Sequence, residues 1–160
     1  MPPRRADPAR LLAAVNEQRA ALGDPPLPAG QGAAAAGRAG LAAVLAALDD
    51  GQHPQRGALR VAVTYLLGLL ETLAPGHAVE VRIPPYAAIQ CVAGPRHTRG
   101  TPPNVVETDA VTWVLLAAGR LGWAQAAADG RVAASGQRAD LSGYLPLAAG
   151  APPAGRASLD

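Results

Sequence analysis

Two different spacings of apolar residues divide the chain into expected strands and helices. Val79–Ile83 alternates strictly between apolar and polar residues, which is typical of a strand buried on one face. Residues 59–73 instead repeat apolar side chains at three- and four-residue spacing, which predicts an amphipathic helix. Pro75 and Gly76 end this helix, and Pro84 and Pro85 end the strand.

The C-terminal half continues with short elements of both kinds. Residues 86–92 are apolar at almost every position, so we expect a second strand in the middle of the sheet. On an expected helix over residues 109–118, one apolar stripe predicts the face that packs on the sheet: Val111, Val114, Leu115 and Ala118. The other expected elements are a strand at Val105 and Val106, a short helix over 123–128, a strand over 131–135 and a closing helix from Asp140.

The first third of the chain predicts helices joined by breaks. Asp7 and Pro8 are typical of a helix start, and residues 24–32 have the composition of a linker. The next segment contains Gly37 and Gly40, and each glycine weakens a helix by about 1 kcal/mol. We therefore expect that helix only from about residue 39. We predict N-terminal helices with a mobile linker over residues 1–53, one folded domain over 54–148 and a disordered tail over 149–160.

Composition and charge narrow the classes of function. All 14 basic residues are arginine and phenylalanine is absent, which fits a high-GC genome. The net charge is only +2, and aromatic residues do not alternate with basic ones, so nucleic acid is not an expected partner. The longest apolar run, residues 39–48, is far shorter than the roughly 20 residues of a membrane span. With one cysteine and no apolar secretory segment near the N-terminus, we expect a cytoplasmic protein.

The stretch over residues 105–147 carries two ordered motifs. A strand leads into xDxxxWxxLxxG, and a short helix then leads into xxDGxVxxSGxxxDLxxxL. This order resembles the sterol carrier protein superfamily, in particular its actinobacterial-type branch of sterol-carrier-like domains, and the resemblance covers residues 59–147. It implies an α/β (α+β) fold in which helices cover one face of a small, mainly antiparallel sheet. It also implies an apolar cavity, with the closing helix as a mobile lid.

Apolar side chains of several expected elements are candidates to line such a cavity. Trp113 and Leu116 lie away from the expected sheet contact of their helix. The candidate lining residues are Val81, Ile83, Ile89, Trp113, Leu116, Leu121, Trp123, Leu141, Tyr144 and Leu145. The same pattern is equally expected of a filled core, because apolar spacing does not reveal whether the enclosed space is hollow.

The loop over residues 94–101 is the main polar feature. Arg96, His97 and Arg99, with backbone N–H groups freed by glycine, are candidates to bind a lipid headgroup or an acyl carboxylate. The alternative is a solvated loop whose arginines pair with Glu107 or Asp109.

No pattern in the chain predicts catalytic residues, a metal site or a cofactor. Cys91 has no companion ligand or base and is expected to be a small buried residue. We therefore expect non-catalytic binding or carriage of a hydrophobic ligand, such as a fatty acyl chain or other lipid. The alternatives are a structural module with a filled core, which acts through a homodimer or a partner protein, and an enzyme that uses Cys91 or the basic loop.

Overall fold

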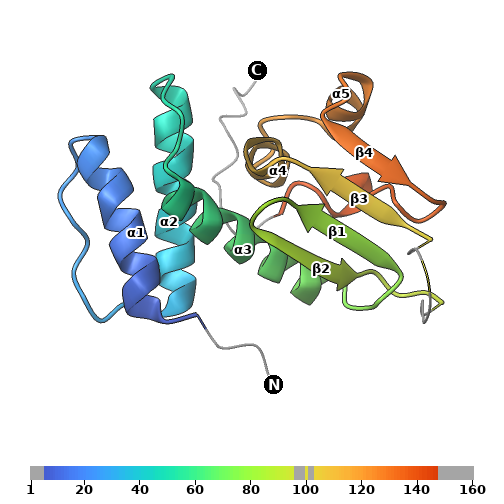
Figure 1. Cartoon of the computed structure of the whole chain (residues 1–160), viewed down its shortest axis with the longest axis horizontal. Coiled ribbons are helices and arrows are strands. Elements are labelled where there is room, and N and C mark those ends of the chain that lie inside the picture. Colours follow the sequence, from blue (N-terminus) through green and yellow to red (C-terminus); the bar gives the residue numbers. More distant parts are fainter. Residues whose placement is uncertain (1–5, 96–99, 101–102, 148–160) are drawn as a thin grey trace, which may run out of the picture. The chain divides into compact units, whose positions relative to one another are not determined.

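The computed structural model describes residues 6–95, 100 and 103–147. In this part of the chain five α-helices and a four-stranded mixed sheet form two compact units, Met1–Tyr65 and Leu66–Asp160 (Figure 1). The predicted mixed α/β fold is confirmed. The units divide inside the long helix, whereas the domain boundary expected from the sequence lies after residue 53 and stays a prediction. The expected tail over 149–160 lies outside the described residues.

The first unit is helical. It contains α1 (Pro8–Ala21), α2 (Ala33–Asp49) and the first part of α3 (Arg56–Leu73), and α1 packs beside α2 (Figure 1). The predicted start of α1 is confirmed, because the Asp7 carboxylate accepts from the N–H of Ala9 at 3.0 Å. Two hydrogen bonds between the Asn16 side chain and the backbone of Leu27 attach the following loop to α1.

The expected start of the second helix was wrong, since α2 begins at Ala33. Its two glycines are sites of close helix contact. A Cβ on Gly37 would lie 2.6 Å from Cγ of Tyr65, and one on Gly40 would lie 2.6 Å from Cγ1 of Val61. Packing against α3 therefore outweighs the weak helix propensity of glycine.

The second unit is built on a sheet of order β2-β1-β3-β4. The strands are β1 (Val79–Ile83), β2 (Ala87–Cys91), β3 (Val105–Thr108) and β4 (Val132–Ser135). β1 pairs antiparallel with β2 and parallel with β3, and β3 pairs antiparallel with β4. The expected central position of residues 86–92 was wrong, because β2 lies at an edge. Its apolar run includes Ala88, which tolerates exposure because its side chain is small.

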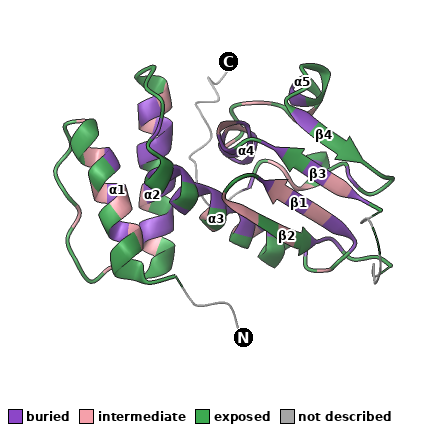
Figure 2. Ribbon diagram, viewed as in Figure 1, coloured by how far each residue is buried: buried purple, intermediate pink, exposed green. Residues whose placement is uncertain are grey.

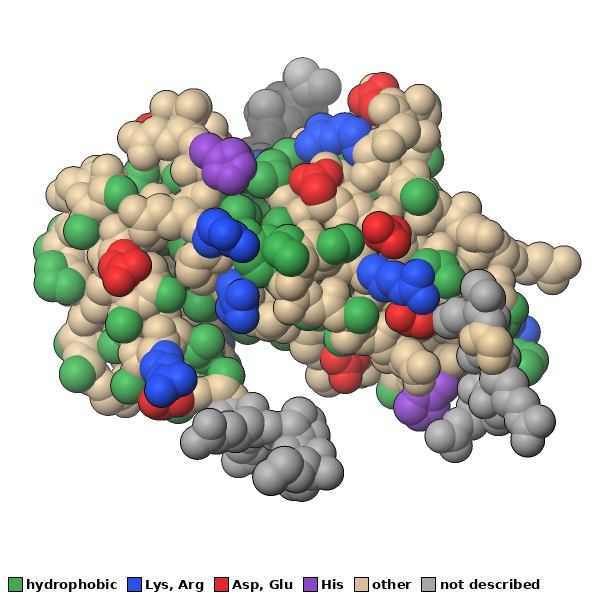
Figure 3. Space-filling view, viewed as in Figure 1, with side chains coloured by type: hydrophobic (Ala, Val, Ile, Leu, Met, Phe, Trp, Pro, Cys, Tyr) green, Lys and Arg blue, Asp and Glu red, His purple; other side chains and the backbone are tan. Residues whose placement is uncertain are grey.

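The two faces of this sheet differ in chemistry. Val79, Val81 and Ile83 are fully buried on the inner face, and buried and half-buried residues alternate along β1 (Figure 2). Figure 1 shows the C-terminal part of α3 crossing behind β1 and β2. The outer face carries an ion pair in which Nε of Arg82 lies 2.8 Å from Glu80. Acidic and basic side chains lie next to one another over the strands in Figure 3.

The C-terminal helices are α4 (Ala110–Ala117) and α5 (Trp123–Ala128). The predicted contact face of α4 is buried only in part, since Val114 alone of its four residues is fully buried. Val111 and Leu115 are only half-buried, whereas the buried residues are Ala110, Thr112, Trp113, Val114, Leu116 and Ala117. Nearly every residue of α4 is apolar, so spacing alone could not choose the buried face.

The expected closing helix is reduced to a single 3-10 turn, Ser142–Tyr144. The Asp140 carboxylate accepts from the N–H of Ser142 at 2.9 Å, which closes a local turn in place of a helix. Two residues after this turn, Pro146 cannot donate a helical hydrogen bond. The described residues 140–147 therefore do not form the expected helical lid.

Candidate functional site

The candidate lining residues fall into two classes of burial. Those buried in the second unit are Val81, Ile83, Trp113, Leu116 and Leu141, and those half-buried are Ile89, Leu121, Trp123, Tyr144 and Leu145. The sheet brings three of them together, because Val81 pairs with Ile89 and Ile83 follows on the same face. Trp113 and Leu116 lie one turn apart on α4.

The segment that carries Tyr144 and Leu145 returns to the C-terminal end of α4. The N–H of Leu147 donates to the carbonyl oxygen of Ala117 at 2.9 Å. A Cβ on Gly119 would lie 3.2 Å from Cβ of Pro146, so the chain also packs closely there. The structure thus brings the C-terminal candidate residues next to the helix of Trp113.

Trp113 differs from its neighbours in the bonding of its indole nitrogen. The residue is 1% exposed, and its Nε1 is a buried donor with no acceptor among the described residues. The sequence predicted Trp113 only as an apolar lining residue and gave no role to its N–H group. The unmatched donor depends on what surrounds the ring, which apolar spacing does not specify.

A polar network joins β3, α4 and the start of β4. The Asp109 carboxylate accepts from the N–H of Thr112 at 3.0 Å and from the Thr112 hydroxyl, so Asp109 caps the start of α4. Nε of Arg131 donates to the same hydroxyl at 3.1 Å. The Thr108 hydroxyl donates to the carbonyl oxygen of Arg131 at 2.6 Å. This network lies beside a surface hollow of about 290 Å³ that is lined by Pro84, Glu107, Thr108, Asp109, Gly130, Arg131 and Ala133.

A larger surface hollow of about 490 Å³ lies in the first unit, between α1 and the loop that follows it. Its lining includes Leu12, Asn16 and Leu27. None of the candidate lining residues borders either hollow. The cavity expected from the sequence therefore stays a prediction.

The candidate headgroup residues Arg96, His97 and Arg99 lie outside the described residues. The start of their loop is described at Gly94, where a Cβ would lie 3.1 Å from Cζ of Arg138. The N–H of Arg138 donates to Oδ1 of the buried Asn104, whose Nδ2 donates to the carbonyl oxygen of Ala78. Sequence reasoning missed both residues, because these contacts join segments far apart in the chain.

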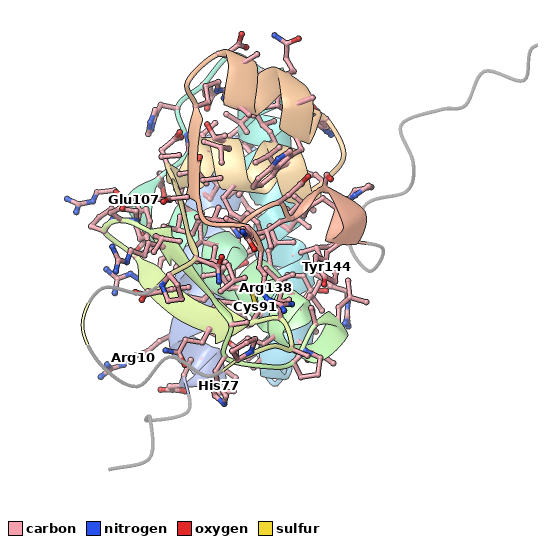
Figure 4. The ribbon with its side chains drawn as sticks, turned by 90° about the vertical axis from the view of Figure 1, so that its right-hand side faces the viewer. Arg10, His77, Cys91, Glu107, Arg138 and Tyr144 are labelled. Atoms are coloured by element: carbon pink, nitrogen blue, oxygen red, sulfur yellow. The ribbon has the colours of Figure 1, made fainter. Side chains whose placement is uncertain are left out.

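Cys91 lies inside the second unit, whereas Glu107 lies at its outer side (Figure 4). Burial, with a smaller contribution from the charge of Glu71, raises the pKa of the Cys91 thiol to about 11. The thiol is therefore protonated at neutral pH and is a poor nucleophile.

Neither a metal centre nor a membrane span is found in the described part of the chain. No three His, Cys, Asp or Glu residues there are grouped to hold a metal ion. No helix there has both the length and the hydropathy that crossing a membrane requires.

Comparison with models of known protein families gives a match. The family model described as "Bacterial SCP ortholog" matches residues 55–147, which is more than half of the chain. No curated protein matches the chain. The matched range contains the whole sheet and all the candidate site residues.

Proposed function

The chain belongs to the bacterial SCP ortholog family, and we propose that it binds or carries a hydrophobic ligand, a fatty acyl chain or other lipid, without catalysing a reaction. The observation that carries this proposal is the family match, because it spans every candidate lining residue. The matched range also contains the inner sheet face, on which Val81 and Ile83 are fully buried.

An apolar site of this kind needs no chemically distinctive side chain. Burial of apolar surface contributes about 25 cal/mol per Å², so an acyl chain gains affinity from contact area alone. The protonated thiol of Cys91 agrees with a non-catalytic role, because a thiolate would be needed for nucleophilic attack.

Native mass spectrometry of the freshly purified protein, followed by titration with a fluorescent fatty acid, tests the proposal. We expect a co-purifying lipid and saturable quenching of tryptophan fluorescence, with quenching lost in Trp113→Ala. Circular dichroism of this variant checks that it is folded. Ser135→Ala, on the exposed outer face of β4, is the matched control and should bind like the wild type. No lipid and no quenching at any chain length would contradict the carrier function.

A filled structural module is the second candidate, and the burial of five lining residues favours it. Val81, Ile83 and Leu141 are completely buried, as expected of side chains packed against one another. Such a module would act through a homodimer or a partner protein. The same mass spectrum separates the candidates, because the module would give an oligomer mass or a bare chain without lipid.

A further inference from the structure

The indole N–H of Trp113 is a buried donor that the described residues leave unmatched. Among them, its Nε1 is the one buried side-chain nitrogen or oxygen without a hydrogen-bond partner. Buried donors are almost always paired, because an unpaired one loses its bond to water and gains nothing in exchange. An acceptor that arrives with a ligand would remove this cost.

We propose that the Trp113 N–H donates to the carbonyl oxygen of a neutral acyl ester, so that the ligand is an esterified rather than a free fatty acid. This inference rests on the proposed function, because it assigns the chemistry of the ligand at that same site. The acyl chain would lie among the apolar residues that are buried with Trp113 on α4, such as Val114 and Leu116.

Other polar groups of α4 and its neighbours are already paired. The Thr112 hydroxyl donates to Asp109 and accepts from Nε of Arg131. The Thr108 hydroxyl donates to the carbonyl oxygen of Arg131. Trp113 therefore carries the buried side-chain donor that is left without a partner among the described residues.

Two alternative acceptors fit this environment less well. A buried water needs two to four polar partners, and the indole N–H supplies one of them, so a water here would need its further bonds from groups that already have a partner or from the backbone. A carboxylate would need a cation, and the buried polar side chains of the described chain are all neutral: Gln18, Asn104, Thr108 and Thr112. A carbonyl oxygen bonded to an alkyl chain requires only the single donor that is present.

Binding of methyl palmitate, with heptadecane as a chain-matched probe that lacks an acceptor, tests the inference. We expect the indole ¹H–¹⁵N signal of Trp113 to move downfield and its hydrogen exchange to slow when the ester binds, with Trp123→Phe used to assign the two indole signals. Trp113→Phe should weaken ester binding about three- to tenfold more than heptadecane binding, because the loss of one neutral hydrogen bond changes affinity by about this factor. If Trp113→Phe does not fold, benzothienylalanine at position 113 replaces the N–H with sulfur at nearly the same size.

Each outcome has a distinct meaning. If the ester binds but the Trp113 signal does not respond, or both probes lose affinity equally, the hydrogen bond is refuted while the carrier function stands. If palmitate at pH 8 binds as tightly as its ester, a carboxylate site replaces the ester site. If neither probe nor palmitate binds, the proposed function fails and this inference fails with it.

Discussion

The Gln18 side chain accepts a hydrogen bond from the backbone N–H of Gln55 at 2.7 Å. Gln18 lies on α1 and is 1% exposed, whereas Gln55 directly precedes the first residue of α3. A side chain 37 positions away in sequence thus satisfies one of the N–H groups left free at a helix start. The end of one helix is held by the buried face of another.

Replacement of this amide should destabilise the protein. Gln18→Met keeps the length of the side chain but removes the acceptor, so the N–H of Gln55 loses its partner at a partly buried helix start. We expect a loss of about 1–2 kcal/mol in the free energy of unfolding, measured by urea denaturation. Glu17→Met, at an exposed position of the same helix, is the control and should change stability little. Equal effects of the two substitutions would contradict a role for the hydrogen bond.

Two glycines within helices should respond oppositely to alanine. A Cβ on Gly40 would lie 2.6 Å from Cγ1 of Val61, whereas one on Gly68 meets nothing within 4 Å. Gly40→Ala should therefore destabilise by about 1–3 kcal/mol through overpacking. Gly68→Ala should stabilise by about 0.5–1 kcal/mol, because alanine is the better helix former. Thermal unfolding of both variants measures these changes in stability. A double variant, Gly40→Ala with Val61→Ala, should recover stability because it relieves the close contact. A destabilising Gly68→Ala would contradict the open space at Gly68.

The helix cap at Asp109 gives a third prediction. Asp109→Ala removes the acceptor for the N–H of Thr112 and should cost about 1–2 kcal/mol. Asp109→Asn retains a good capping oxygen and should cost less. Denaturant titration of the three proteins measures the order of stability. A loss in Asp109→Asn as large as in Asp109→Ala would show that charge, and not capping, is the important property.

Ionisation of Cys91 should make stability depend on alkaline pH. Its pKa is about 11 in the folded protein, above the ordinary value of 9.0, so the folded state holds the proton more tightly. The stability that comes from holding this proton is fully present below the pKa of the thiol in the unfolded chain. It is lost as pH rises from about 9 through 11. The unfolding free energy of the wild type should therefore fall more steeply over this window than that of Cys91→Ala.

Thiol alkylation offers an independent check of the same group. At pH 8 the folded protein should react with iodoacetamide far more slowly than the unfolded chain, because the buried thiol is protonated. Rapid labelling of the folded protein would contradict both the burial and the raised pKa.

Structural features that depend on residues close together in the sequence were predictable from the sequence. The alternation in Val79–Ile83 identified β1 with both of its ends, because a strand places successive side chains on opposite faces. The carboxylate of Asp7 identified a helix start, since a cap acts over only two or three residues. The ordered motifs over residues 105–147 identified the family.

Features set by contacts between distant segments were decided only by the tertiary structure. Helix α2 begins at Ala33 because close packing on α3 accepts its glycines, although their local propensity opposes a helix. Strand β2 lies at an edge, and Trp113 faces the interior, because pairing and burial depend on partners that periodicity does not name. By itself the sequence determined the period of β1 and α3 and the family, whereas the fold decided which face is buried and left the Trp113 N–H without a partner in the described part of the chain.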